Sequence, residues 1–237
     1  MKDIYNSSRL YLKALLLALK YQKLLGEDFE ANFLLTKEIC QKVLEIAGIE
    51  VESFNEDNVP VDKSVMLYAN HKNILDPLFI LATINRSTSF VAKSSLFKYP
   101  IVKDFLTAID CISLNRKETD AKKIIATQKE IISHLKYDRS LLIFPEGRRV
   151  GEDEIAKFKD ASFRAPKQVD SYILPTYIDG TNHIFKKKTK LVFSPGLKKV
   201  TIIYGEPFKA RELGFKNTKD ISEYTQEQVL KLKREMV

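Results

Sequence analysis

The sequence has no tryptophan, two cysteines, three histidines and eight each of glycine and proline in 237 residues. Cys40 and Cys111 lie far apart and lack the spacing of metal ligands, so we expect neither a disulfide framework nor a zinc site. No apolar run reaches the ~18 uninterrupted residues of a membrane span, and the N-terminus shows no small-residue cleavage site. These absences predict a protein that is not exported and that works in a reducing, intracellular setting.

Charged and apolar residues make up most of what the chain does contain. With 44% hydrophobic and 30% charged residues, it can bury one good core. Its 39 Lys and Arg against 31 Asp and Glu give a formal charge of +8. That excess favours phospholipid headgroups, phosphorylated substrates, acidic carrier proteins or nucleic acid as partners. The densest basic run, at 185–190, has no recognition helix or aromatic platform around it, which argues against nucleic acid.

Two helical patterns open the sequence, over residues 8–25 and 29–48. Gly26 can end the first and Asp28 can cap the second, which predicts a helical hairpin before the main fold. In the first pattern, the basic residues at 9, 13, 20 and 23 share one narrow stripe on a helix otherwise covered by Leu, Ala and Tyr. Both a helix at a membrane interface and a helix packed on the domain with its lysines in water would show this pattern.

Short apolar runs with few charges then follow, most of the early ones separated by helical segments. This alternation predicts an α/β fold with a mixed, mostly parallel sheet flanked by helices. The expected strands are 65–69, 90–92, 111–114, 141–144, 172–178, 191–193 and 200–204. We expect the helical hairpin to occupy 1–50 and the α/β domain 51–237.

Polar and ionisable residues gather in the loops after four of these strands. Ligand sites in such folds form where strands run out at the carboxyl edge of the sheet, so these loops predict one site. Its candidate residues, in chain order, are Asn70, His71, Asp76, Lys93, Arg116, Glu146, Gly147, Arg148 and Arg149.

His71 and Asp76 can form a base with an orienting carboxylate. Residues five apart on one helix face roughly 140° away from each other, so the pair must straddle a turn. Pro77 suits the first helical position and makes Asp76 a natural N-cap. With Nδ1 held by Asp76, His71 would present Nε2 as a base for the proton of an alcohol. The alternative is that Asp76 only caps the helix and His71 is an ordinary loop histidine.

The segment 144–149 reads Phe-Pro-Glu-Gly-Arg-Arg, a tight turn after a strand. Arginines on such a turn suit bidentate binding of a phosphate. Cys111 lies in the strand before Arg116, where a buried packing role is expected in place of a thioester nucleophile. His134 and His183 have no motif around them and are expected at the surface.

Four ordered blocks, spread over roughly residues 60–210, resemble the glycerolipid acyltransferases with an Asn-His-x4-Asp motif. The blocks are Asn70-His71 with Asp76, Ile112–Arg116, Phe144–Arg149 and the strand at Leu174-Pro175. The resemblance implies that His71 is the general base and that Asp76 orients it. It also implies that Lys93, Arg116 and Arg149 grip a phosphate, beside a turn formed by Glu146 and Gly147. Asn70 and Arg148 complete the expected substrate-binding set.

The reaction implied by this resemblance is transfer of an acyl group to the sn-2 hydroxyl of 1-acylglycerol-3-phosphate, which makes phosphatidate in phospholipid biosynthesis. Acyl-carrier protein or acyl-CoA would supply the acyl group as co-substrate, without a metal, a cofactor or a covalent acyl-enzyme. The family's N-terminal two-helix element lies on the membrane, which implies peripheral or monotopic binding at the cytoplasmic face. The alternatives are another acceptor, such as glycerol-3-phosphate or a lyso-aminolipid, and a non-catalytic membrane-binding homologue.

Four positions depart from the family pattern. Arg148 replaces a usual Thr, Asp110 a usual Gly, Ser113 a bulky apolar residue, and Asp160 a usual Gly. An additional arginine beside Arg149 would strengthen phosphate binding or shift the acceptor headgroup. Asp110 would oppose an anion if it faced the site.

Overall fold

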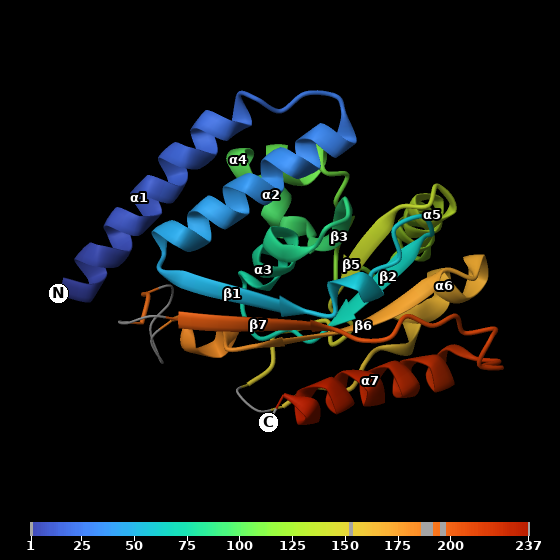
Figure 1. Cartoon of the computed structure of the whole chain (residues 1–237). Coiled ribbons are helices and arrows are strands. Elements are labelled where there is room, and N and C mark those ends of the chain that lie inside the picture. Colours follow the sequence, from blue (N-terminus) through green and yellow to red (C-terminus); the bar gives the residue numbers. More distant parts are fainter. Residues whose placement is uncertain (1, 152–153, 186–191, 195–197, 237) are drawn as a thin grey trace.

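The computed structural model describes residues 2–151, 154–185, 192–194 and 198–236. Within these ranges one seven-stranded sheet lies between two layers of helices (Figure 1). The strands are β1 (Ile49–Phe54), β2 (Val65–Ala69), β3 (Thr88–Lys93), β4 (Ile112–Leu114), β5 (Ser140–Ile143), β6 (Tyr172–Asp179) and β7 (Lys198–Tyr204). The helices are α1 (Lys2–Gln22), α2 (Phe29–Ile46), α3 (Asp76–Thr83), α4 (Pro100–Ala108), α5 (Ala121–Lys136), α6 (Arg164–Val169) and α7 (Thr218–Glu235). Short 3-10 turns occur at η1 (Glu56–Asn58), η2 (Ser94–Lys98), η3 (Asp160–Phe163) and η4 (Thr181–His183).

The strand order in the sheet is β1-β7-β6-β2-β5-β3-β4. Every neighbouring pair is parallel except β6 and β7, which run antiparallel. The sheet is therefore mixed and mostly parallel, and the predicted fold class is confirmed. Because β2, β5, β3 and β4 are consecutive and parallel, their carboxyl ends emerge together at one edge of the sheet.

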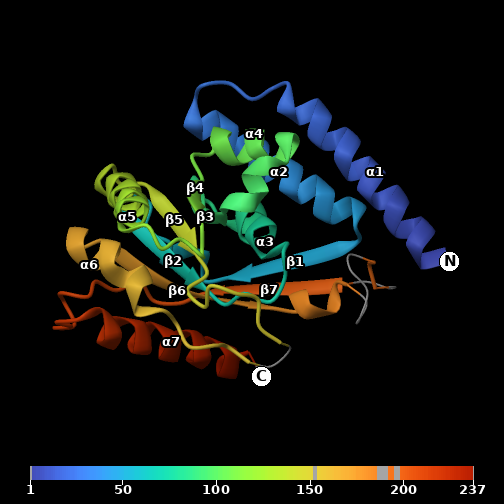
Figure 2. The same cartoon turned by 180° about the vertical axis from the view of Figure 1, so that it is seen from behind.

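Side chains on the central strands alternate between two cores. In β2, Val65, Leu67 and Ala69 belong to the core on the side of α2, α3 and α4, whereas Met66 and Tyr68 belong to the core on the side of α5, α6 and α7. All five are completely buried. A strand covered on both faces has no position for a charge, which explains the apolar runs in the sequence. Figure 2, seen from behind, shows the same two layers.

The predicted hairpin is present, but its first helix begins and ends earlier than expected and its second ends earlier. The second helix begins at Phe29, and the Asp28 carboxylate caps it by accepting the N–H of Ala31 at 2.7 Å, as predicted. The first helix ends at Gln22, so Gly26 is not its terminator. The hairpin shares its core with the sheet, because Phe33, Cys40 and Leu44 of α2 pack in the cluster that contains β2.

Strand β1 is not among the predicted strands, because its acidic residues are typical of a polar linker. It pairs in parallel with β7, and the expected boundary at residue 50 falls inside it. Six of the expected strands are present. Of the seventh, at 191–193, residue 191 lies outside the described residues and Phe193 forms only an isolated bridge to Phe185. Residues 186–190 of the predicted basic run also lie outside the described part.

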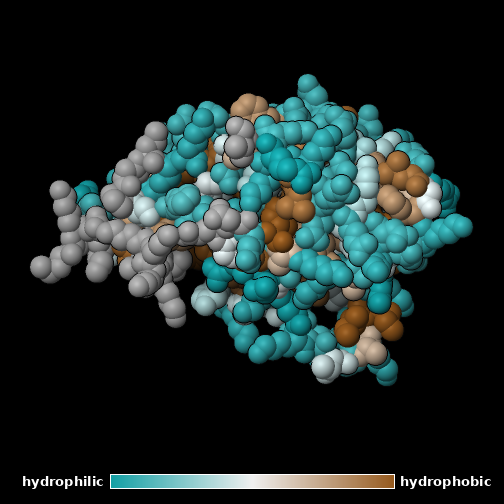
Figure 3. All heavy atoms as spheres, turned by 90° about the horizontal axis from the view of Figure 1, so that it is seen from below, coloured by the Kyte–Doolittle hydropathy of each residue, from teal (hydrophilic) through white to brown (hydrophobic). Residues whose placement is uncertain are grey.

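The apolar side chains of α1 remain largely exposed. The larger ones are Tyr11, Leu12, Leu15, Leu16 and Leu19, with 39–58% of their surface exposed. By contrast, the face on the α7 side is mostly hydrophilic, with small separate apolar areas (Figure 3). In the described part of the chain, no helix is both long and apolar enough to span a bilayer.

Candidate active site

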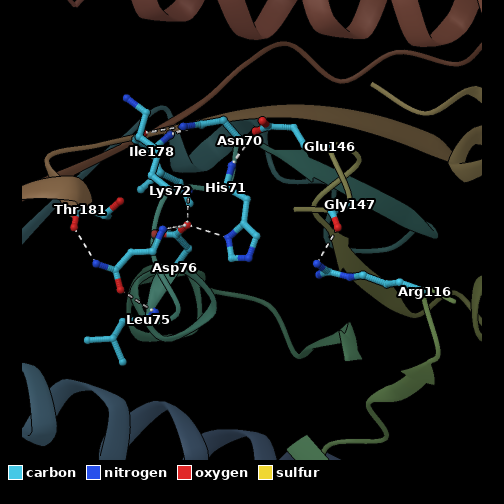
Figure 4. A network of polar contacts seen from close by, with 11 residues as sticks. Asn70, His71, Lys72, Leu75, Asp76, Arg116, Glu146, Gly147, Ile178 and Thr181 are labelled. Carbon is cyan, nitrogen blue, oxygen red and sulfur yellow. Dashed lines mark hydrogen bonds and ion pairs between the residues drawn. The ribbon is translucent and has the colours of Figure 1, made fainter. Parts of the chain in front are cut away.

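The predicted catalytic pair lies where the loop after β2 meets the start of α3. The Nδ1 atom of His71 lies 2.8 Å from Oδ2 of Asp76, and this oxygen also accepts the N–H groups of Lys72 at 2.7 Å and Asn73 at 2.8 Å (Figure 4). Asp76 is fully buried, and only 10% of the His71 side chain is exposed. Since a carboxylate only accepts hydrogen bonds, Nδ1 carries the proton and Nε2 keeps its lone pair. The predicted contact between the two side chains is present.

The predicted N-cap role of Asp76 is wrong. Helix α3 begins at Asp76 itself, with Leu75 as its N-cap and no side-chain cap. The Asp76 carboxylate turns back toward the preceding loop, because the N–H groups of residues 72 and 73 converge there and hold it against His71. The side chain therefore organises the loop upstream, and the first turn of the helix receives no hydrogen bond from it.

The turn after β5 holds His71 from the other side. Glu146 accepts the N–H of His71 at 2.8 Å and the N–H of Ala156 at 2.9 Å, while the His71 carbonyl accepts the N–H of Val150 at 2.9 Å. The ring of Phe144 stacks on the imidazole with their centroids 4.3 Å apart. Burial raises the pKa of Glu146 above its ordinary value, although the two backbone hydrogen bonds oppose the shift. These contacts fix the position of the base.

Asn70 and Glu146 do not face substrate as predicted. Both are almost fully buried, at 1% and 3% exposure. The amide of Asn70 donates to the carbonyl of Ile178 at 2.9 Å and accepts its N–H at 2.8 Å, which ties the loop to β6. The amide of Asn73, which the sequence analysis missed, donates to the carbonyl of Thr181 at 2.7 Å. Because their polar atoms already have backbone partners, these side chains position the loops. Substrate would be bound by other residues.

Arg116 reaches the turn that carries Arg149. Nη1 of Arg116 donates to the Gly147 carbonyl at 2.6 Å (Figure 4). Burial lowers the pKa of Arg116, and the charge of Arg149 lowers it further, so the two guanidinium groups are close enough to repel each other. Lys93 is exposed at the end of β3, in register with Leu114 two residues before Arg116. Arg148 is exposed on the same turn.

The two acidic departures from the family pattern point elsewhere. Asp110 forms an ion pair with Arg139, before β4 starts and so at the opposite edge of the sheet from the site. Asp160 accepts a hydrogen bond from Ser222 of α7 at 2.6 Å. Neither carboxylate therefore opposes an anion at Gly147.

Cys111 is buried, and burial raises the pKa of its thiol, which fits a packing role.

An apolar cavity of about 660 Å³ lies on the α1–α4 side of the sheet. Its walls are almost wholly apolar and come from α1, α2, α3 and α4 and from Phe90 of β3. Helix α3 contributes Leu78 and Leu81 to the wall and carries Asp76 at its first position. Helix α3 therefore contributes both to the cavity wall and to the carboxylate that contacts His71. In the described residues, no group of three or more His, Cys, Asp or Glu side chains gathers to hold a metal ion.

Sequence reasoning also missed Lys159, whose ammonium lies against Gly147. The segment Lys157-Phe158-Lys159 carries a sequence signal for this position. A phenylalanine that is buried between two lysines fixes the direction in which each lysine side chain leaves the backbone.

Comparison with known proteins gives consistent results. A family model described as Acyltransferase matches residues 50–179. The 1-acyl-sn-glycerol-3-phosphate acyltransferase of Borreliella burgdorferi is 28% identical over 70% of this chain and 65% of its own length. The probable 1-acyl-sn-glycerol-3-phosphate acyltransferase of Mycoplasma pneumoniae is 29% identical over 67% of this chain and 60% of its own length. The match thus spans less than two thirds of each of these relatives.

A solved structure shows the same fold over nearly the whole chain. The crystal structure of the 1-acyl-sn-glycerophosphate (LPA) acyltransferase PlsC from Thermotoga maritima superposes with a TM-score of 0.83. The two chains are 23% identical, and the match covers 99% of this chain and 96% of the other. The similarity includes the N-terminal helices as well as the sheet.

Proposed function

The chain belongs to the acyltransferase family, and from this premise we propose that it transfers a fatty acyl group from a thioester to the sn-2 hydroxyl of 1-acylglycerol-3-phosphate. The product is phosphatidate, the precursor class for membrane phospholipids. The observation that carries the proposal is the His71–Asp76 pair, held beside the turn that carries Arg149 and that Arg116 contacts at Gly147. Relatives named for this reaction support the choice of acceptor.

His71 acts as the general base. Its Nε2 accepts the proton of the acceptor hydroxyl as the hydroxyl oxygen attacks the thioester carbonyl carbon. The tetrahedral intermediate then expels the thiolate, which takes the proton back from the imidazolium and leaves as a free thiol. Asp76 stabilises the imidazolium and keeps Nδ1 protonated. The hydroxyl of the substrate is the nucleophile, so the step needs no serine or cysteine of the enzyme.

Arg116 and Arg149 bind the phosphate of the acceptor. Two guanidinium groups that repel each other at Gly147 gain from a shared dianion, and a phosphate monoester carries ≈ −1.5 to −2 charge at neutral pH. Arg148 and Lys93, both exposed near this edge, add positive potential that attracts the headgroup. Binding there places the glycerol hydroxyls within reach of the turn that holds His71.

The apolar cavity receives a fatty acyl chain. Its volume lies within the ~300–1,000 Å³ of typical ligand pockets, and its walls offer almost no polar partner. Helix α3 lines this cavity and also carries Asp76, which holds the base His71. The acyl group arrives as a thioester of acyl-carrier protein or coenzyme A, and the net charge of +8 favours either of these anionic donors.

Helix α1 binds the cytoplasmic face of the membrane as an interfacial helix. Its exposed leucines lie next to the stripe of basic residues, so leucines enter the acyl boundary while lysines reach anionic headgroups. The cavity is walled partly by α1, through Ala14, Leu15 and Ala18. A lipid substrate therefore passes from the bilayer to the cavity along the same helix.

The test is thiol release from acyl-CoA and from acyl-carrier protein, with lysophosphatidate in anionic vesicles. Acceptor-dependent release should occur in the wild type and fall by 10² or more in H71A, while H183A, which changes an exposed histidine, stays active. Absence of wild-type activity with both donors would reject this acceptor and direct the search to glycerol-3-phosphate and lyso-aminolipids. Vesicle binding without turnover on any acceptor would indicate a non-catalytic homologue.

A further inference from the structure

A third cation, Lys159, reaches Gly147 from the segment that follows the turn. A Cβ atom added to Gly147 would lie 2.6 Å from Nζ and 2.9 Å from Cε of Lys159. The Lys159 ammonium therefore rests directly against the Cα of Gly147, while the Arg116 guanidinium holds the carbonyl of the same residue. The Lys159 N–H also donates to the carbonyl of Pro145 at 3.1 Å, which joins the two segments through their backbones.

Lys159 is held in place by α7. Gln226 accepts the N–H of Phe158 at 3.1 Å and donates to the carbonyl of Ala156 at 3.3 Å. The side chain of Phe158 is 1% exposed and fixes the backbone one residue before Lys159. Asp160, one residue after it, accepts a hydrogen bond from Ser222. The segment is thus anchored on both sides of Lys159, and its long side chain extends from a fixed backbone to Gly147.

Among the described residues, no carboxylate pairs with these cations. In the described part of the chain, neither Arg116, Arg149 nor Lys159 forms an ion pair. Glu146, the residue before Gly147, directs both of its oxygens to backbone N–H groups. Like charges gathered without a counter-charge destabilise one another, and an anion removes that cost.

We propose that Lys159 is a third ligand of the acceptor phosphate and that it sets specificity for a phosphate monoester. This assignment rests on the proposed function, because it adds a residue to the same site. A dianionic monoester is neutralised better by three cations than by two, whereas a phosphodiester carries one charge and an uncharged glycerolipid none. Gly147 is then required for space, since any side chain there would displace the ammonium.

The experiment compares K159Q, K159R and K157Q. Lys157 is exposed on the same segment and serves as the matched control. K159Q should raise the KM for lysophosphatidate about tenfold or more, since hydrogen bonds to charged groups are strong. Its kcat and its KM for the acyl donor should remain close to wild type, and turnover of monoacylglycerol should not fall. K159R should restore much of the affinity, and K157Q should behave as wild type.

A second measurement does not depend on turnover. Inorganic phosphate should raise the melting temperature of the wild type and of K157Q more than that of K159Q. If the wild type does not acylate lysophosphatidate but this difference is present, the acceptor proposal fails and the phosphate site at Lys159 stands. If K159Q matches K157Q in both acceptor KM and phosphate response, Lys159 is not a ligand. Equal loss of activity on charged and uncharged acceptors would also overturn the proposal, because it would show a purely structural role.

Discussion

The backbone N–H of His71 donates to the carboxylate of Glu146 at 2.8 Å, across 75 residues of sequence. This bond joins the loop that carries the base to the turn that carries Gly147, Arg148 and Arg149. Because Val150 also donates to the carbonyl of His71, both backbone polar groups of the base are held by this one segment. The distance between the proposed base and the turn with the arginines is therefore set by contacts to the main chain of His71.

Replacing Asp76 with asparagine should nearly abolish turnover. The amide carries no negative charge to stabilise the His71 imidazolium, and its NH2 group would take the buried place of Oδ1, which has no hydrogen-bond partner among the described residues. We expect kcat to fall by 10² to 10⁴ and the free energy of unfolding to fall by about 1–3 kcal/mol. Steady-state kinetics and urea unfolding measure the two effects. D62N, at an exposed position, is the control, and a fully active D76N would refute the role of Asp76.

Glu146 should make stability depend on pH. Burial raises its pKa above the ordinary value of 4.5, so the neutral form is favoured in the folded state. The stabilisation that Glu146 contributes is complete at pH values below its ordinary pKa. It is lost as the pH rises through the raised pKa of the folded state. The stability of wild type relative to E146Q should therefore decline as the pH rises above the ordinary value of 4.5 in urea titrations. A relative stability that increases with pH would show that the backbone hydrogen bonds outweigh burial.

Alanine substitutions at Gly147 and Gly214 distinguish the effect of backbone strain from the effect of displacing a neighbouring side chain. Both have positive φ, at +69° and +73°, but only Gly147 has Lys159 where a Cβ would lie. Each alanine substitution should cost roughly 1–2 kcal/mol of unfolding free energy. Only G147A should also raise the KM for lysophosphatidate, because it displaces the ammonium. An acceptor KM unchanged in G147A would mean that the position of Lys159 has no effect on binding.

Filling the cavity should shift the acyl-chain preference. Ala14 lines the cavity from α1, and A14F would occupy part of its 660 Å³. We expect the ratio of kcat/KM for long over short acyl donors to fall, since the longer chain loses its binding space. L16F, on the exposed side of the same helix and outside the cavity wall, should leave the ratio unchanged. An unaltered ratio in A14F would place the acyl chain elsewhere.

The exposed face of α1 should control membrane binding. L12E and L16E place charges on leucines that are 56% and 58% exposed, so folding should be unaffected. Sedimentation with anionic vesicles should show much weaker binding of the double variant, while a donor and a soluble short-chain acceptor should still react. Unchanged sedimentation would mean that another surface contacts the bilayer.

The sequence by itself determined the layers of the fold and the catalytic pair. Apolar runs such as Val65–Ala69 can form only strands covered on both faces, and Pro77 after Asp76 marks a helix start that leaves His71 in a loop. These features follow from local periodicity and backbone restriction, which neighbouring residues decide. The phosphate-binding turn was predictable for the same reason, because proline, glycine and arginines are adjacent there.

Contacts between distant segments were decided only by the tertiary structure. The acidic strand β1 is held at the sheet edge by pairing with β7, although its composition resembles a linker. Asn70 and Glu146 resembled substrate ligands, but backbone groups more than seventy residues away use their polar atoms. Lys159 reaches Gly147 because Gln226 of α7 fixes its segment. A side chain's type limits the bonds it can form, but its partner depends on which strands become neighbours, and strand order is a property of the whole chain.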